Sequence, residues 1–147
     1  MVVGFPRPVP GLVIRYSYLW RAERLAGNEE GLKDRPCAII LVTYDLDDRE
    51  IVTVLPITHS PPPDPGLAIE IPLETKVRLG LDSDRSWVML SEANRFVWPG
   101  PDLRFPAGKE ASNAAYGLVS RTFFRSLRDR FISVLKSGQA RVVERDG

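Results

Sequence analysis

The chain has 147 residues, with 20 Lys and Arg against 19 Asp and Glu, and it contains one histidine and one cysteine. This length predicts a single domain over residues 1–147, large enough to bury a core without disulfides or metal. One cysteine excludes an intrachain disulfide and any multi-cysteine zinc site, and one histidine excludes metal sites that need two imidazoles. We therefore expect no metal and no other cofactor.

Membrane and export signals are missing from the sequence. No apolar run reaches the roughly 18–20 residues that span a bilayer, and residues 1–8 lack the basic start and long apolar stretch of a signal peptide. We expect a soluble protein that acts in the cytoplasm and has no membrane partner.

The charge is distributed unevenly along the chain. Residues 1–103 carry 11 Lys and Arg against 15 Asp and Glu, a net of −4, whereas residues 104–147 carry 9 against 4, a net of +5. Sixteen of the 20 cations are arginine, which suits phosphate recognition because the guanidinium is a bidentate fork. A GC-rich genome explains the same bias, so charge alone does not identify the partner.

Residues 12–98 show the pattern of five or six short strands separated by turns. Alternating apolar residues over 12–20 predict the first strand, and a charged loop over 21–35 follows. The apolar run 37–44 and residues 51–58 predict a hairpin closed by the acidic turn 45–50. Three successive prolines make 59–66 a rigid loop, and residues 67–73, 86–91 and 93–98 predict further short strands.

The spacing of the apolar residues changes from strand-like alternation to a helical pattern in the C-terminal part of the chain. Ser120 is a good N-cap, apolar residues recur at helical spacing through Lys136, and Gly138 sits where a helix would stop. Residues 140–144 predict a last strand. Because no helix is expected between the earlier strands, the pattern argues against a βαβ fold. We expect a mainly β fold with α (α+β): a small barrel or sandwich over about 10–98 and a helix over about 120–137.

The predicted hairpin brings two polar residues to the same end. Arg35 ends the loop before one strand and Thr58 ends the other strand, so we expect both to meet at the same rim of the sheet. A guanidinium beside a hydroxyl can bind an oxyanion or a phosphate. The alternative is structural, with Arg35 in a salt bridge and Thr58 completing the strand end.

Five segments then resemble a known family in their order and spacing. They are Gly11-Leu-Val-Ile, Asp34-Arg-Pro-Cys-Ala-Ile-Ile-Leu41, Val54-Leu-Pro-Ile-Thr58, Val88-Met-Leu-Ser-Glu-Ala-Asn-Arg-Phe-Val97 and Tyr116-Gly-Leu-Val-Ser120. Together they resemble the MazF/PemK/Kid family of bacterial toxins, and the PemK-like branch more than the shorter MazF toxins. The resemblance covers about residues 10–136.

This resemblance implies an SH3-like β-barrel with a C-terminal helix. It also implies the toxin of a type II toxin–antitoxin system, a homodimer that a cognate antitoxin neutralises. The implied activity is metal-independent cleavage of single-stranded RNA by an mRNA interferase. In that reaction the 2′-hydroxyl attacks the adjacent phosphate and leaves 2′,3′-cyclic phosphate and 5′-hydroxyl ends.

The resemblance also assigns roles to individual residues. Arg35 matches the family's arginine before proline and would stabilise the transition state, and Thr58 would hydrogen-bond the scissile phosphate or the attacking oxygen. Some relatives carry an arginine two residues before an aspartate on the late strand, where this chain has Leu90 and Glu92, so Glu92 is the candidate base. The remaining candidates are His59 as acid or base, and Lys33, Ser60 and Arg95 as RNA contacts.

Two other functions remain open at this point. A non-catalytic protein of the same fold could block a protein target such as gyrase, as the similar CcdB toxins do. An SH3-like interaction domain could instead use its aromatic residues as a peptide groove. Those residues are Tyr16, Tyr18, Trp20, Trp87 and Trp98.

Overall fold

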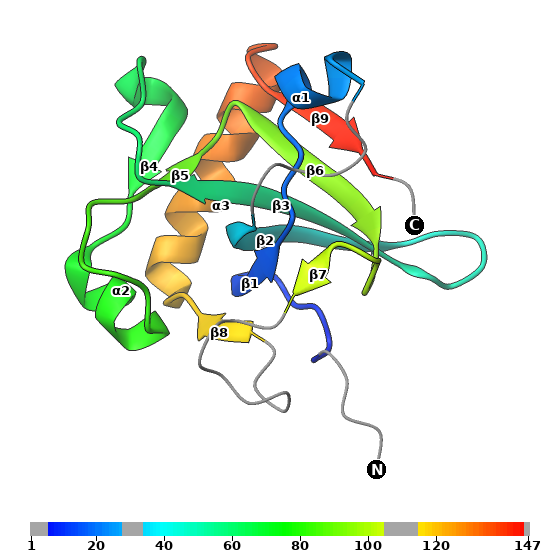
Figure 1. The fold of residues 1–147 in the computed structure, drawn as a ribbon, viewed down its shortest axis with the longest axis horizontal. Coiled ribbons are helices and arrows are strands. Elements are labelled where there is room, and N and C mark those ends of the chain that lie inside the picture. The colour runs from blue at the N-terminus through cyan, green and yellow to red at the C-terminus, as the bar shows by residue number, and fades with distance from the viewer. Residues whose placement is uncertain (1–5, 28–33, 105–114, 146–147) are drawn as a thin grey trace.

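Antiparallel strands account for most of the architecture. The computed structural model describes residues 6–27, 34–104 and 115–145, which form a mainly β, α+β structure with a nine-stranded sheet (Figure 1). The elements in chain order are β1 (Leu12–Tyr16), α1 (Arg21–Leu25), β2 (Arg35–Tyr44), β3 (Glu50–Thr58), a 3₁₀ turn (Pro65–Leu67), β4 (Ala68–Glu70), α2 (Leu73–Leu79), β5 (Trp87–Met89), β6 (Glu92–Val97), β7 (Leu103–Arg104), β8 (Ala115–Leu118), α3 (Arg121–Lys136) and β9 (Arg141–Glu144).

The predicted hairpin forms the centre of the sheet. β2 and β3 pair antiparallel from Cys37 opposite Pro56 to Tyr44 opposite Glu50, with an irregularity after Ile39. β1 pairs with the other edge of β2, while β3 pairs with β5 at its end and with β6 along its first half. β6 also pairs in parallel with β9. The end of β3 is therefore flanked by strands on both sides.

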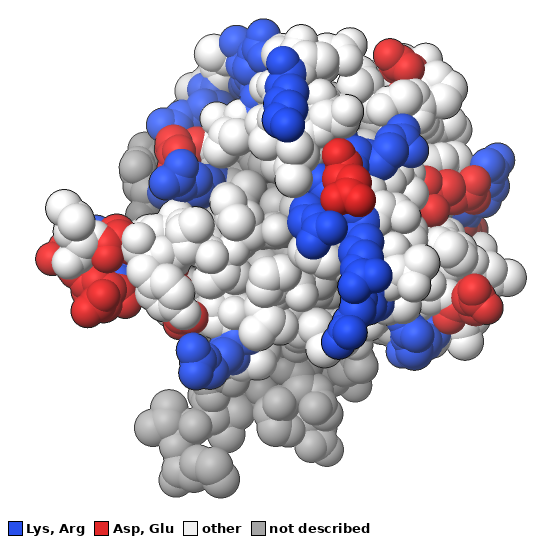
Figure 2. Space-filling model, turned by 180° about the vertical axis from the view of Figure 1, so that it is seen from behind, with Lys and Arg blue, Asp and Glu red and all other residues white. Residues whose placement is uncertain are grey.

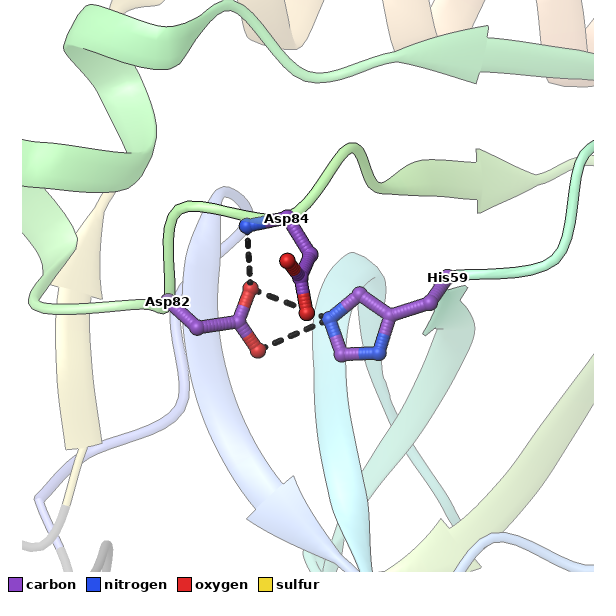
Figure 3. Close-up of side chains that lie close together, drawn as sticks. All are labelled: His59, Asp82 and Asp84. Carbon is purple, nitrogen blue, oxygen red and sulfur yellow. Dashed lines mark hydrogen bonds and ion pairs between the residues drawn. The ribbon is translucent and has the colours of Figure 1, made fainter.

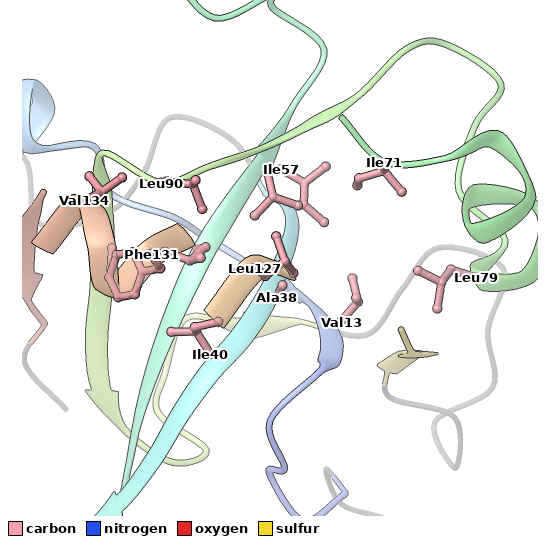
Figure 4. Close-up of a cluster of buried hydrophobic side chains, with 13 residues drawn as sticks. Val13, Ala38, Ile40, Ile57, Ile71, Leu79, Leu90, Leu127, Phe131 and Val134 are labelled. Carbon is pink, nitrogen blue, oxygen red and sulfur yellow. The ribbon is translucent and has the colours of Figure 1, made fainter. Parts of the chain in front are cut away.

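Side chains alternate across the central strands and separate the apolar residues into two cores. The helix-side core lies between the sheet and α3, as Figure 4 shows. It contains Val13, Ala38, Ile40, Leu55, Ile57, Ile71, Leu79, Val88, Leu90, Ala93, Leu127, Phe131 and Val134. The aromatic core lies on the other face of the same strands. It contains Leu12, Ile14, Tyr16, Tyr18, Cys37, Ile39, Val52, Val54, Phe96 and Leu103.

The C-terminal helix forms as predicted. The Phe123 backbone N–H donates to Ser120 Oγ at 3.1 Å and caps the helix start. Leu127, Phe131 and Val134 are buried at helical spacing against the sheet. The opposite face carries exposed arginines, and Figure 2 shows Lys and Arg side chains gathered on this side of the molecule.

The expectation that no helix lies between the strands is wrong in two places. The first strand ends at Tyr16 and is followed by α1 within the expected loop. The strand expected over 67–73 is shorter, since β4 covers Ala68–Glu70, and α2 forms over Leu73–Leu79, between two predicted strands. α1 buries none of its residues, and α2 buries Lys76 among its few inward positions, so neither shows an apolar stripe. Strands β7 and β8 also follow residue 98 and pair with β1, which extends the sheet past the expected limit.

Candidate functional site

Arg35 and Thr58 lie at the same end of the central hairpin. Arg35 is the first residue of β2 and is paired with Tyr16 of β1. Thr58 is the last residue of β3 and is paired with Trp87 of β5. The paired register of β2 and β3 begins at Cys37 opposite Pro56, so Arg35 and Thr58 each lie two residues beyond that pair. An unbroken register would place them opposite each other, on the same face of the sheet.

The Arg35 guanidinium is held by an aromatic ring rather than by an acid. Its carbon lies 5.0 Å from the centre of the Trp20 ring, a cation–π contact. Its buried Nε has no hydrogen-bond partner, and no described residue forms an ion pair with the side chain. The adjacent Asp34 is directed instead to Arg15 and Arg104, at 3.6 and 3.9 Å. Trp20 therefore positions Arg35, and no acid in residues 6–27, 34–104 or 115–145 neutralises its charge.

A chain of contacts leads from Trp20 to Glu92. The Trp20 ring packs edge-on against Tyr18, with 5.0 Å between ring centres. The Tyr18 hydroxyl donates to Glu92 Oε1 at 3.3 Å, and the Arg21 backbone N–H donates to the same oxygen at 3.0 Å. Glu92 thus lies on the aromatic-core face that also carries Arg35.

The environment of Glu92 suits a proton acceptor. Partial burial raises the pKa of Glu92 above the usual range of a glutamic acid, although the hydrogen bonds from Arg21 and Tyr18 oppose this. A general base works best when its pKa lies closer to the operating pH. Burial and the Glu92 charge in turn raise the pKa of Tyr18, so its hydroxyl stays protonated and acts as a donor.

A buried polar network fixes the segment that carries Tyr18 and Trp20. Asn94 accepts the Leu19 backbone N–H at 2.9 Å and donates to the Leu19 carbonyl at 2.8 Å. Arg145 donates to Asn94 Oδ1 at 3.0 Å, to the Ser17 carbonyl at 2.8 Å, and to Asp102 Oδ2 at 2.7 Å. These partners are 43 to 128 residues from Arg145 in sequence, and the sequence pattern gave no signal for them.

Thr58 and Ser60 form a local turn at the end of β3. The Ser60 backbone N–H donates to Thr58 Oγ1 at 3.2 Å. This bond uses the hydroxyl oxygen as an acceptor and leaves the hydroxyl proton available as a donor. Thr58 is partly buried and Ser60 is exposed, so Thr58 can donate to an anion that Arg35 also binds.

His59 lies apart from this group. Successive strand residues point to opposite faces, and His59 reaches from the end of β3 towards the loop before β5, as Figure 3 shows. Its Nε2 lies 2.8 Å from Asp82 Oδ2, while Lys76 Nζ, with a side chain only 2 % exposed, lies 2.9 Å from Asp82 Oδ1. Against the effect of burial, the Lys76 and His59 hydrogen bonds lower the pKa of Asp82.

This cluster has one property of a cation site. Ligand-type atoms of His59, Asp82 and Asp84 lie within 4.8 Å of one another. However, the Lys76 ammonium also contacts the Asp84 carbonyl and Ser86 Oγ. A positive charge is therefore already present among these groups, and the geometry favours a fixed histidine over a metal centre.

The remaining predicted contacts are not part of this arrangement. Arg95 is paired with Thr53, five residues before the end of β3, and lies 3.5 Å from Glu144. Five residues of extended strand correspond to about 16 Å. Lys33 lies outside the described residues. Arg35 and Glu92 are linked through Trp20 and Tyr18, and Thr58 ends the strand next to β2, so these three residues remain the candidate site.

In comparisons with known proteins, no protein-family model matches this chain, and no curated protein matches it at a significant level.

Every helix within the described ranges is too short or too polar to cross a lipid bilayer.

Proposed function

We propose that the chain is a toxin of the MazF/PemK/Kid type, a metal-independent endoribonuclease that cleaves single-stranded RNA. The observation that carries the proposal is the state of Arg35. Its guanidinium is fixed over Trp20, has no acidic partner among the described residues, and begins the strand whose hairpin neighbour ends at Thr58. A preorganised cation of this kind is suited to a phosphate whose charge increases during reaction.

The proposed roles follow from the contacts of each side chain. Glu92 accepts the proton of the attacking 2′-hydroxyl, because its raised pKa increases its basicity. Arg35 and Thr58 donate to the phosphate oxygens as the oxygen–phosphorus bond forms and the 5′-oxygen leaves. The leaving 5′-oxygen takes a proton from solvent, and Glu92 later releases to solvent the proton that it accepted, so the products are a 2′,3′-cyclic phosphate and a 5′-hydroxyl. Tyr18 and Trp20 hold Glu92 and Arg35 in place.

The same proposal extends to the fold and the partners. We infer an SH3-like barrel with a C-terminal helix, supported by the aromatic core, which residues of β1, β2, β3, β6 and β7 share. We also infer a cytoplasmic homodimer that a cognate antitoxin holds inactive. These inferences rest on the sequence resemblance.

An aromatic peptide groove receives less support. Tyr16 and Tyr18 are each 1 % exposed, and Trp87 is also buried. These side chains form core instead of an open surface, so three of the five aromatic residues are unable to line a groove.

The proposal is tested by RNA digestion with the parent protein and with Arg35→Ala and Thr58→Ala. Removing one transition-state donor is expected to reduce the rate about 10²- to 10³-fold, with the larger loss for Arg35→Ala. The matched control is Arg85→Ala, because Arg85 also lies 5.0 Å from a tryptophan ring but is ion-paired with Glu70 at 2.8 Å. Equal rates for Arg35→Ala and the parent would refute the proposal, and an inactive parent would favour a non-catalytic toxin that blocks a protein target.

A further inference from the structure

A cavity of about 260 Å³ opens beside the candidate site, on the other face of the sheet. Its walls are Pro36 at the start of β2, Ile57 near the end of β3, Leu81, and Tyr116 of β8, with His59, Asp82 and Ser86 as polar groups. Gly80 ends α2 with a left-handed φ of 71°, which turns the chain so that Leu81 and Asp82 reach the wall. The cavity is smaller than the 300–1,000 Å³ of typical drug-sized sites.

The polar side of this cavity presents an acceptor. His59 Nε2 is within hydrogen-bond distance of both Asp82 oxygens, at 3.0 and 2.8 Å. In the neutral imidazole tautomer that donates from Nε2 to this carboxylate, the other ring nitrogen, Nδ1, is an acceptor. Asp82 itself is occupied, since Oδ1 also accepts from Lys76 at 2.9 Å and from the Asp84 backbone N–H at 3.1 Å. The ligand therefore meets the imidazole and the apolar walls rather than the carboxylate.

Residues that line the cavity are direct neighbours, in the sequence, of residues of the candidate site. Pro36 follows Arg35, while Ile57 and His59 flank Thr58. Adjacent strand residues are about 3.3 Å apart and point to opposite faces. A phosphate bound at Arg35 and Thr58 would therefore lie at the end of the hairpin. From there the adjoining nucleotide can place its base in the cavity on the other face of the sheet.

We propose that this cavity, the His59–Tyr116 pocket, binds the nucleobase of a nucleotide next to the scissile phosphate and sets the base preference of cleavage. The inference rests on the proposed endoribonuclease function. A flat heterocycle packs against Tyr116 and between the Pro36, Ile57 and Leu81 side chains, and an N–H donor on its edge bonds His59 Nδ1. Stacking on an aromatic ring favours nucleobases, and the hydrogen bond discriminates among them.

The first test measures cleavage of an RNA pool with randomised positions around the cleavage site. Parent protein is expected to show a base preference at one flanking position. Tyr116→Leu and His59→Ala are expected to reduce that preference about tenfold or more, while Tyr116→Phe, which keeps the ring, retains it. Unchanged preference in both Tyr116→Leu and His59→Ala would overturn the pocket proposal while leaving cleavage itself intact.

The second test needs no cleavage. RNA pentamers with 2′-O-methyl groups lack the nucleophile, and the imidazole of His59 gives a single NMR signal because the chain has one histidine. Saturating pentamer is expected to shift this signal in parent and Tyr116→Phe and to leave it unshifted in Tyr116→Leu. An unshifted parent signal, or an equal shift in Tyr116→Leu, would overturn the pocket. A shifted signal in a parent that does not cleave RNA would support the pocket and refute the endoribonuclease.

Discussion

The Arg35 guanidinium carbon lies 5.0 Å from the centre of the Trp20 ring, although Trp20 caps the start of α1 and Arg35 begins β2. A tryptophan face is the best aromatic partner for a cation. It also leaves the hydrogen-bond donors of the guanidinium unused, which a carboxylate partner would not. Trp20 therefore acts as a positioning residue for Arg35.

Replacing Trp20 tests this relationship. Trp20→Ala is expected to lower the cleavage rate roughly tenfold, because a partly desolvated cation–π contact contributes about 1–2 kcal/mol. Trp20→Phe retains most of the activity. If Trp20 acts only through Arg35, Trp20→Ala adds no further loss in an Arg35→Ala background. Losses that multiply in the double variant would contradict the positioning role.

The pH dependence of cleavage reports on Glu92. The carboxylate must be deprotonated to accept the 2′-hydroxyl proton, so the rate rises with pH as Glu92 loses its proton. Since burial raises the pKa of Glu92, this rise is expected above the usual range of a glutamic acid. Glu92→Gln is expected to remove this rise, the acidic limb of the pH–rate profile, and to lower the rate about 10²- to 10⁴-fold. An unchanged acidic limb in Glu92→Gln would assign the base elsewhere.

The same residue predicts a pH-dependent change in stability. A raised pKa means that the folded state binds the Glu92 proton more tightly than the unfolded state does. The contribution of Glu92 to folding is therefore fully present at low pH and is lost as pH rises through the raised pKa. Glu92→Gln keeps an oxygen for the Tyr18 and Arg21 donors, and its urea midpoint should improve relative to parent between pH 4 and pH 8. A constant difference between the two proteins would contradict the shift.

Asp102 and Arg145 form the buried ion pair that secures the segment next to the site. Their side chains are 8 % and 2 % exposed and 2.7 Å apart. Asp102→Ala leaves the Arg145 charge buried without its carboxylate, and the free energy of unfolding should fall by about 3–5 kcal/mol. The matched control is Glu70→Ala, which breaks the exposed pair with Arg85 and should leave the urea midpoint nearly unchanged. Similar midpoints for both variants would contradict a structural role for the buried pair.

The parts of the fold that could be predicted have local causes. The apolar run of β2, its hairpin with β3, and the helical spacing after Ser120 are patterns within one segment, and all three elements form as predicted. α2 could not be predicted in the same way, because Lys76 occupies one of its buried positions and is stabilised by Asp82 and Ser86. Strands as short as β7 form through pairing with β1, which no local pattern encodes.

The candidate site likewise contains one relationship that a local pattern predicts and others that depend on contacts between distant segments. The position of Arg35 and Thr58 at one end of the hairpin follows from the pairing of β2 with β3, so the sequence predicts it. The contact between Tyr18 and Glu92 joins residues 74 apart and depends on the whole sheet. The separation of His59 from Thr58 did have a signal, since adjacent strand residues point to opposite faces, and applying that alternation beyond the strand end would have placed His59 correctly.

The most direct test of the central claim is the chemistry of the RNA ends. A defined single-stranded RNA is incubated with parent protein in the presence of a chelator, and the fragments are analysed by mass spectrometry. We expect 2′,3′-cyclic phosphate on the upstream fragment and a 5′-hydroxyl on the downstream fragment, with neither formed by Arg35→Ala. Intact RNA, or fragments carrying 5′-phosphate ends, would contradict the account.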